Sequence, residues 1–245
     1  MRESSPPSTV RAINIQTGFA GVGFDLVTPQ GTFQIHSPLL GEFNVSNILA
    51  AATAALGHGI PIKAVREGIE KCPSVPGRFE RVDVGQPFLI VVDYSHTDDA
   101  IRNAIRAARA LNPARVITVF GCGGDRDRSK RPLMGMVAAR LSDVVVITSD
   151  NPRSEDPKRI IEEIERGIPA GSQSSPRTPT VVSTVDRAEA IERAIAMAEA
   201  GDVVLIAGKG HEKYQQIGDR VLPFDDGDVA RAALAKRRRG EAKPS

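Results

Sequence analysis

Residues 143–168 read DVVVITSDNPRSEDPKRIIEEIERGI, and this stretch decides the fold. It begins with DVVVIT, a short apolar run that indicates a buried strand. It ends with DPKRIIEEIERGI, in which an Asp-Pro pair precedes apolar residues at helical spacing, as is typical of a helix start. The turn between them carries acids, an arginine and a proline, so it can continue neither the strand nor the core.

The same unit, an apolar strand followed by a helix, repeats through the second part of the chain. Strands are predicted at FLIVVD, RVITVF, DVVVIT, TVVST and DVVLIAG. Helices are predicted across DDAIRNAIRAARAL, after Pro132, across DPKRIIEEIERGI and DRAEAIERAIAMAEA, and from about Asp226. This alternation predicts an α/β fold with a mostly parallel, doubly wound sheet and helices on both faces. Ligands of such sheets bind beyond the carboxyl ends of the strands.

The first part of the chain has a different pattern. Three alternating runs, VRAINIQTG, GVGFDLVTP and TFQIHS, are separated by turns rich in glycine and predict a small antiparallel meander over residues 10–37. One helix is predicted from about Val45 to Gly57, and a second begins near Pro61. This part ends at the turn of residues 73–77.

Composition and charge exclude several classes of protein. The chain has 245 residues, enough for one large domain or two modest ones, and a net charge of +2, so no electrostatic footprint for nucleic acid or an anionic membrane is present. The basic run at residues 236–239 closes the last predicted helix, where it complements the helix dipole. Two cysteines without CxxC spacing argue against a disulfide framework and a cysteine-built zinc site.

The chain also lacks the patterns of exported and membrane proteins. Its start, MRESSPPSTV, has no signal-peptide layout, and no apolar run approaches the roughly 20 residues needed to span a bilayer. We therefore expect a cytoplasmic protein that is neither exported nor anchored.

Four loops that follow strands carry most of the unusual polar residues. They read DYSHTDD, GCGGDRDRSKRP, SDNPRSEDP and GKGHEKYQ. The second fails the dinucleotide pattern G-x-G-x-x-G because Arg126 occupies the last glycine position, and the chain contains no G-x-x-x-x-G-K-[ST] phosphate loop. Its basic residues, Arg126, Arg128, Lys130 and Arg131, fit either a solvated turn or an anion site. Cys122 has no evident local base and is interpreted as a small turn residue.

The third loop offers groups that suit an amino acid. Asp150, Asn151 and Arg153 lie in one turn that Pro152 makes rigid. An arginine matches a carboxylate bidentately, whereas Asp and Asn are expected to accept from an ammonium group. Asp156 is interpreted as a helix cap instead.

In the fourth loop, Glu212 either accepts from an ammonium group or is only a first-turn acid. In the first loop, Asp98 or Asp99 can cap the helix, and His96 is more often a turn histidine than a catalyst.

Six strings in the chain resemble the Mur ligases, and within that family the enzymes that add diaminopimelate. They follow the family's order across residues 41–216: GEFNVSNILAA, VPGRFE, VVDYSHTDDAI, VFGCGGDRDRSKRPLMG, SDNPR and GKGHEKYQ. The FDD string at residues 224–226 is also in place, whereas Asp98 stands where the family usually has proline. Six motifs in order are far more specific than any single one.

The resemblance implies a Rossmann-like C-terminal ligase domain over residues 75–245. Residues 1–74 would be the last third of a central ATPase domain whose P-loop, magnesium ligands and modified lysine lie upstream. The resemblance implies diaminopimelate contacts at Arg126, Asp150, Asn151, Arg153, Gly208 and Glu212. It implies ATP contacts at Asn47, Arg78, Asp93 and His96, and neither a catalytic residue nor a metal ligand within this chain.

By the same resemblance, the whole enzyme uses ATP and Mg²⁺ to join meso-diaminopimelate to UDP-N-acetylmuramoyl-L-alanyl-D-glutamate through an acyl phosphate, in peptidoglycan synthesis. We expect this chain, as a monomer, to supply the diaminopimelate-binding part and to be inactive alone. One alternative is a non-catalytic fragment that binds diaminopimelate and nucleotide. Others are a ligase like folylpolyglutamate synthetase, which the DNPR and GKGHE strings do not suit, and a nucleotide-dependent oxidoreductase, whose glycine fingerprint is replaced by VVDYSHTDD.

Overall fold

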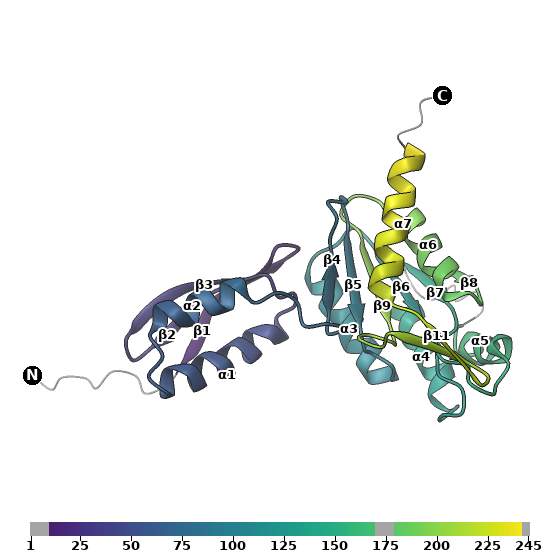
Figure 1. Cartoon of the computed structure of the whole chain (residues 1–245), viewed down its shortest axis with the longest axis horizontal. Coiled ribbons are helices and arrows are strands. Elements are labelled where there is room, and N and C mark those ends of the chain that lie inside the picture. The colour runs from purple at the N-terminus through teal and green to yellow at the C-terminus, as the bar shows by residue number, and fades with distance from the viewer. Residues whose placement is uncertain (1–9, 170–178, 242–245) are drawn as a thin grey trace, which may run out of the picture. The chain divides into compact units, whose positions relative to one another are not determined.

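The chain forms two compact units, residues 1–74 and residues 75–245, which are described separately. The computed structural model describes residues 10–169 and 179–241 (Figure 1). Residues 1–9, in which the sequence has no signal-peptide layout, lie outside the described residues. Within the described part, no helix combines the length and apolar character needed to cross a membrane.

The first unit packs two helices on a three-stranded sheet. Strands β1 (Arg11–Gly18), β2 (Gly21–Thr28) and β3 (Gly31–Ser37) pair antiparallel in that order, as the alternating runs predict. Helices α1 (Phe43–Gly57) and α2 (Ile62–Lys71) follow. Alternate residues of β2, including Phe24 and Leu26, join Ile35 and the helix residues Val45 and Val65 in one buried cluster.

The second unit is built on a six-stranded sheet in the order β4-β5-β9-β6-β7-β8 (Figure 1). Its strands are β4 (Glu80–Val82), β5 (Leu89–Asp93), β6 (Val116–Phe120), β7 (Val144–Ile147), β8 (Thr180–Ser183) and β9 (Val203–Ala207). All neighbouring pairs are parallel except β4 with β5. The predicted mostly parallel sheet is therefore confirmed, and the antiparallel β4 is an addition that the sequence pattern did not reveal.

Helices cover both faces of this sheet, as predicted. They are α3 (Asp98–Ala110), α4 (Lys130–Leu141), α5 (Pro157–Glu165), α6 (Arg187–Met197) and α7 (Asp226–Glu241). Helices α6 and α7 share one cluster with the sheet, in which Ile191 and Leu234 pack with Ile90, Val204 and Val146. Helix α4 packs between α3 and α5; α3 contacts β9 and β6, and α4 contacts β7. A hairpin of β10 (Tyr214–Ile217) and β11 (Arg220–Pro223) precedes α7.

Short polar side chains cap the starts of α5, α3 and α6; in α6 the Asp186 side chain accepts from Glu189 N. The Asp156 side chain accepts from Lys158 N at the start of α5, so its predicted capping role is confirmed. The cap of α3 is Thr97, which accepts from Ala100 N, rather than Asp98 or Asp99 as the sequence suggested. A hydroxyl in extended backbone reaches the third amide of the helix, and the two acids then lie in its first turn.

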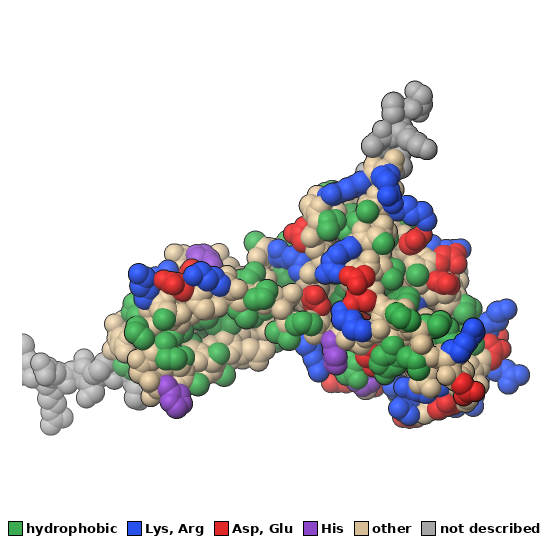
Figure 2. All heavy atoms as spheres, in the orientation of Figure 1, with side chains coloured by type: hydrophobic (Ala, Val, Ile, Leu, Met, Phe, Trp, Pro, Cys, Tyr) green, Lys and Arg blue, Asp and Glu red, His purple; other side chains and the backbone are tan. Residues whose placement is uncertain are grey.

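The basic run at the end of α7 binds other elements, in addition to its predicted interaction with the helix dipole. Arg237 donates to the carbonyl oxygens of Ile195 and Ala198 at the end of α6, at 2.6 and 2.8 Å. Lys236 pairs with Glu192 at 2.7 Å, and Arg238 donates to Val84 O. Elsewhere on the visible face of residues 75–245, basic and acidic side chains are interspersed (Figure 2).

A fully buried ion pair ties the starts of α6 and α7 together. Arg187 donates to both carboxylate oxygens of Asp226 at 2.7 and 2.8 Å, and both side chains are completely buried. The same guanidinium donates to Ser149 O at 3.3 Å and Ala207 O at 3.0 Å. These carbonyls lie just after β7 and at the end of β9, so one side chain fixes two strand ends and two helix starts.

We predict that Arg187→Met lowers the free energy of unfolding by about 3–5 kcal/mol, because it leaves a buried carboxylate without its partner. Arg193→Met on the same helix is the matched control. Arg193 pairs with Glu189 at 2.6 Å, but both side chains are half exposed, so its loss should change stability by about 1 kcal/mol at most. Urea unfolding measures both values, and equal losses would contradict the role assigned to burial.

Candidate amino-acid-binding site

The four polar loops gather at the carboxyl edge of the sheet, where backbone hydrogen bonds join them. Gly208 N, after β9, donates to Asp93 O at the end of β5 at 3.0 Å. Gly124 N, after β6, donates to Asn151 O after β7 at 2.9 Å. Arg153 N donates to Gln216 O in β10 at 3.2 Å. The loops therefore form one connected edge.

The loops after β6 and β7 are interlocked at their backbones. A Cβ atom at Gly124 would lie 1.9 Å from Pro152 O, so only glycine permits this approach. Asp125 has a φ of 54°, and its carboxylate accepts from the amide and the hydroxyl of Ser154 at 3.2 and 2.6 Å. These hydrogen bonds lower the pKa of Asp125.

Three of the four basic residues in the β6 loop bind the protein itself. Arg131 is completely buried and donates to Glu155 and Glu163. Arg128 also donates to Glu163, and Lys130 donates to His96 O at 2.9 Å. This loop was interpreted either as a solvated turn or as an anion site. The basic residue that does not bind another loop or helix is Arg126, which is exposed and donates to the neighbouring Asp125 O at 3.1 Å. An anion site in this loop would therefore use Arg126.

Lys209 lies at the centre of the polar cluster, and the sequence interpretation missed it. Its side chain is completely buried, and Nζ lies 3.0 Å from Asn151 Oδ1, 3.3 Å from Glu212 Oε2 and 3.5 Å from Asp150 Oδ1. The sequence around Lys209 does not fit the phosphate-loop pattern, and no other role was predicted for this lysine. The signal that could have found it is a lysine between two glycines directly after a buried strand.

The hydrogen bonds of Asn151 fix the direction of its side-chain amide. Oδ1 accepts from Lys209 Nζ and from Gln216 N at 2.9 Å, and Nδ2 donates to Glu212 Oε2 at 2.9 Å. Both neighbours of Oδ1 are obligatory donors, so the oxygen must face them. The ammonium group from which Asn151 accepts within the protein is thus that of Lys209. Its remaining N–H makes it a donor, which suits a carboxylate.

Arg153 is held in a left-handed conformation by the hairpin. Its φ is 51°, and its own carbonyl accepts from Gly218 N at 2.7 Å. Its Nη1 donates to Gly124 O at 2.7 Å. A Cβ atom at Gly123 would lie 3.0 Å from Arg153 Nη1 and 3.6 Å from Arg126 Cγ. The side chains of the two predicted arginines therefore both lie beside Gly123.

Gly208 allows the β9 loop to approach Asp150. Its φ is 117°, and a Cβ atom there would lie 2.9 Å from Asp150 Oδ2. Asp150 is 7% exposed, and Glu212 is partly buried. The structure thus brings all six predicted amino-acid contacts to one edge: carboxylates at Asp150 and Glu212, and guanidinium groups at Arg126 and Arg153.

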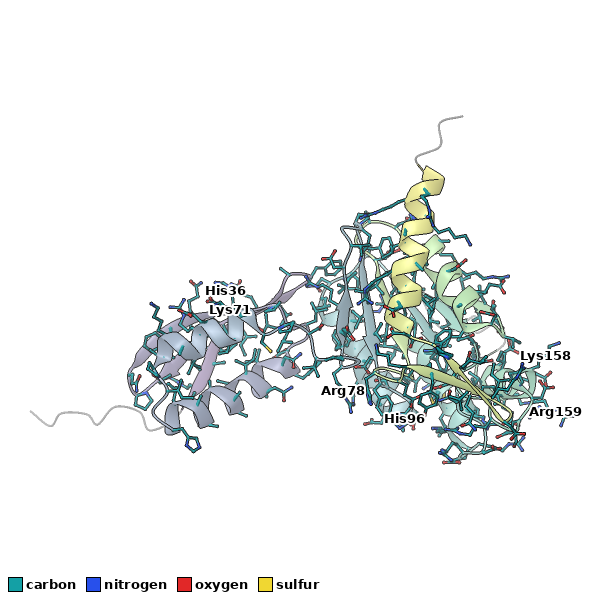
Figure 3. All side chains as sticks on the ribbon, in the orientation of Figure 1. His36, Lys71, Arg78, His96, Lys158 and Arg159 are labelled. Atoms are coloured by element: carbon teal, nitrogen blue, oxygen red, sulfur yellow. The ribbon has the colours of Figure 1, made fainter. Side chains whose placement is uncertain are left out.

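Two of the predicted nucleotide contacts, Arg78 and His96, are labelled in Figure 3 and lie beside the ring of Tyr94, which Asp93 precedes in the chain. The Arg78 guanidinium lies 5.1 Å from the centre of the Tyr94 ring, and the His96 ring lies at 4.7 Å. The carboxylate of Asp93 is used internally, since it accepts from Phe79 N at 2.8 Å and from the amide and hydroxyl of Ser95.

The fourth predicted nucleotide contact belongs to the other unit. Asn47 lies in residues 1–74, on α1, where its Nδ2 donates to Asn44 Oδ1 at 3.0 Å. Sequence reasoning also missed Tyr94 and His211, whose rings lie 5.1 Å apart.

Two further expectations concern chemistry that the site does not use. Cys122 is buried, and burial raises the pKa of its thiol to about 12, as befits a structural turn residue. Within residues 10–169 and 179–241, no group of three or more His, Cys, Asp or Glu side chains is arranged to hold a metal ion.

The chain matches two models of known protein families. The family model described as Mur ligase, glutamate ligase domain, matches residues 77–210, and the Mur ligase middle domain matches residues 3–55. The chain belongs to the Mur ligase family. This result confirms the resemblance seen in the six strings.

The relatives of this Mur ligase chain include UDP-N-acetylmuramoyl-L-alanyl-D-glutamate--2,6-diaminopimelate ligases. That of Solibacter usitatus is 53% identical over 94% of this chain and 45% of its own length. That of Geobacillus thermodenitrificans is 51% identical over 94% of the chain and 46% of its own length. The chain thus spans about half the length of these relatives.

Solved structures agree with the assignment. A ligase of the same name superposes with a TM-score of 0.74 at 38% identity, over 97% of this chain and 47% of that one. Folylpolyglutamate synthase from Mycobacterium tuberculosis superposes with a TM-score of 0.59 over 98% of this chain and 49% of that one. At 20% identity, the second similarity shows the fold alone.

We predict that the link between the β6 and β7 loops weakens in acid. The hydrogen bond from Arg131 lowers the pKa of Glu155 from 4.5 to about 2. A lowered folded pKa stabilises the fold above the unfolded value, so this contribution is complete above pH 4.5 and is lost as pH falls toward 2. Glu155→Gln should therefore lose less stability than the wild type across this window in urea unfolding.

The exposed Glu162 on the following helix, α5, provides the control. Glu162→Gln should keep the pH dependence of the wild type. If Glu155→Gln and Glu162→Gln followed the same curve, the Arg131 contact would not be the cause of the acid sensitivity.

Proposed function

We propose that this chain supplies the diaminopimelate-binding half of an ATP-dependent ligase that adds meso-diaminopimelate to UDP-N-acetylmuramoyl-L-alanyl-D-glutamate in peptidoglycan synthesis. The names of the relatives at 51–53% identity support this substrate. Residues 75–245 would be the C-terminal ligase domain, and residues 1–74 the end of the central domain. We assign the chain to the cytoplasm, as a monomer.

One observation carries the proposal: a single edge of the sheet holds both groups that accept from ammonium and groups that bind carboxylate. Asp150 and Glu212 offer carboxylate oxygens around Lys209. Arg153 and Arg126 both lie beside Gly123 and offer guanidinium groups. An amino acid with a second carboxylate, such as diaminopimelate, can use both sets at once.

In the proposed reaction, the described residues bind and orient the attacking amine. Asp150 and Glu212 would hold the ammonium group, and Arg153 with Arg126 would bind the distal carboxylate. After losing a proton, the amine attacks the acyl phosphate of D-glutamate, forms the amide bond and displaces phosphate. This positioning replaces an encounter in solution and is a large part of what such a site can contribute.

The nucleotide would contact Arg78, Asp93, His96 and Asn47. Arg78 is the member of this set whose guanidinium stacks on an aromatic ring, which leaves its N–H edge suited to phosphate. Asp93 would act through the turn that it holds at Phe79 N. Magnesium, when bound, neutralises phosphoryl charge.

A binding fragment without catalysis is the second candidate function. The observation that favours it is that the 245 residues contain no G-x-x-x-x-G-K-[ST] phosphate loop. A folylpolyglutamate-synthetase-like activity is less well supported, because that relative shares the fold at only 20% identity.

We predict that the chain binds meso-diaminopimelate at least about tenfold more tightly than L-lysine, which lacks the distal carboxylate that a charge-assisted hydrogen bond would recognise. Arg153→Met should remove most of this preference in a calorimetric titration. Arg159→Met is the matched control, because Arg159 is exposed on α5 (Figure 3). Equal affinity of the wild-type chain for both ligands would refute the proposed specificity.

We also predict that the 245-residue chain releases no phosphate above background when it is incubated with ATP, Mg²⁺, the UDP-muramoyl dipeptide and diaminopimelate. The physical reason is that positioning the amine does not activate the carboxylate that it attacks. A coupled phosphate assay measures the rate, with a full-length relative as the positive control. Turnover by the chain would contradict this prediction and exclude the binding-fragment alternative.

A further inference from the structure

The side chain of Lys209 is enclosed by the residues proposed to bind the substrate. Its Nζ has three donor hydrogens and three oxygen neighbours, on Asn151, Glu212 and Asp150, at 3.0, 3.3 and 3.5 Å. The ring of Tyr214 lies 5.4 Å away on another side. A buried ammonium needs such partners, because its transfer from water is otherwise very costly.

The backbone on both sides of Lys209 permits little alternative placement. Gly208 and Gly210 have φ values of 117° and 52°, in the region that favours glycine. A Cβ atom at Gly210 would lie 2.7 Å from Tyr94 Cβ, and Gly208 N is bonded to Asp93 O. The lysine is therefore presented by a loop whose position is fixed at both ends.

The charges around Lys209 do not cancel. Asp150 and Glu212 contribute two negative charges, and Lys209 contributes one positive charge. The nearby Arg187 is neutralised by its own partner, Asp226, at 2.7 Å. The cluster therefore keeps one net negative charge, which an ammonium group of a ligand would balance.

We propose that Lys209 is a positioning residue: its buried ammonium keeps the Asp150 and Glu212 carboxylates together as charged acceptors and orients Asn151 as a donor, so that the loops receive an ammonium beside a carboxylate. This inference rests on the proposed function for the identity of the ligand. Its electrostatic part rests on the contacts alone. Without the lysine, two carboxylates face one another in a buried space, and protonation of one relieves the repulsion.

The first test needs no ligand. Melting temperatures of the wild-type chain, Lys209→Met and Lys209→Met/Glu212→Gln are compared at pH 5.5 and 8.5. The loss caused by Lys209→Met should be larger at pH 8.5, where both carboxylates are charged. The double variant should show the same loss at both pH values, since a single carboxylate remains. An equal loss for Lys209→Met at both pH values would overturn the proposal.

The double variant also decides the case in which Lys209→Met does not fold. Recovery of folding on adding Glu212→Gln would support an electrostatic role. A double variant that stays unfolded would show that Lys209 acts by packing, and would overturn the proposal. Lys236→Met is the matched control, because Lys236 pairs with Glu192 at 2.7 Å but is 69% exposed, and it should show no pH-dependent loss.

The second test uses meso-diaminopimelate in calorimetric titrations at the same two pH values. Lys209→Met should bind about tenfold or more weakly at pH 5.5 and recover part of this loss at pH 8.5, because the charged carboxylates again attract the ammonium. A loss that is equal at both pH values would overturn the positioning role. If the wild-type chain binds no diaminopimelate while the melting results are as expected, the proposed function fails and the electrostatic role of Lys209 stands.

Discussion

The buried pair of Arg187 and Asp226 is the interaction on which the ligand-binding edge depends. Its guanidinium is shared among a carboxylate at the start of α7, Ser149 O after β7 and Ala207 O at the end of β9. These carbonyls immediately precede Asp150 and Gly208. Since the peptide unit is planar, fixing each carbonyl also fixes the amide that follows it. One buried cation thus sets the directions in which two of the loops proposed to bind ligand leave the sheet.

The charged residues of this unit fall into two groups with different duties. Arg128 and Arg131 both donate to Glu163 and so join α5 to the β6 loop. The groups proposed to bind ligand are instead positioned by backbone hydrogen bonds. Arg153, for example, has a left-handed backbone conformation, and its amide and carbonyl are bonded to the hairpin of β10 and β11. Glycine makes this possible, since Gly124 lies where any Cβ atom would meet Pro152 O. Charges used for structure and charges left for a ligand are therefore separated by close backbone packing.

The sequence predicted the parts of the fold that depend on local pattern. Buried runs such as those of β7 and β9 and the helices after them follow from periodicity, and the gathering of their loops follows from parallel strands sharing a carboxyl edge. The direction of the Asn151 amide and the place of Lys209 were not predictable in this way. They depend on contacts between residues 58 or 65 positions apart, which no local pattern encodes. The same reason hid the partners of Arg131.

The two proposed ligand sets differ in how they depend on the chain. All six proposed contacts of the amino acid belong to the unit of residues 75–245, as does Lys209, which contacts three of them. Of the proposed nucleotide contacts, Asn47 belongs to the unit of residues 1–74, and Arg78, Asp93 and His96 belong to the other. A site formed within one packed unit is preorganised by that unit's own core. We therefore expect recognition of the amino acid to need only the unit of residues 75–245.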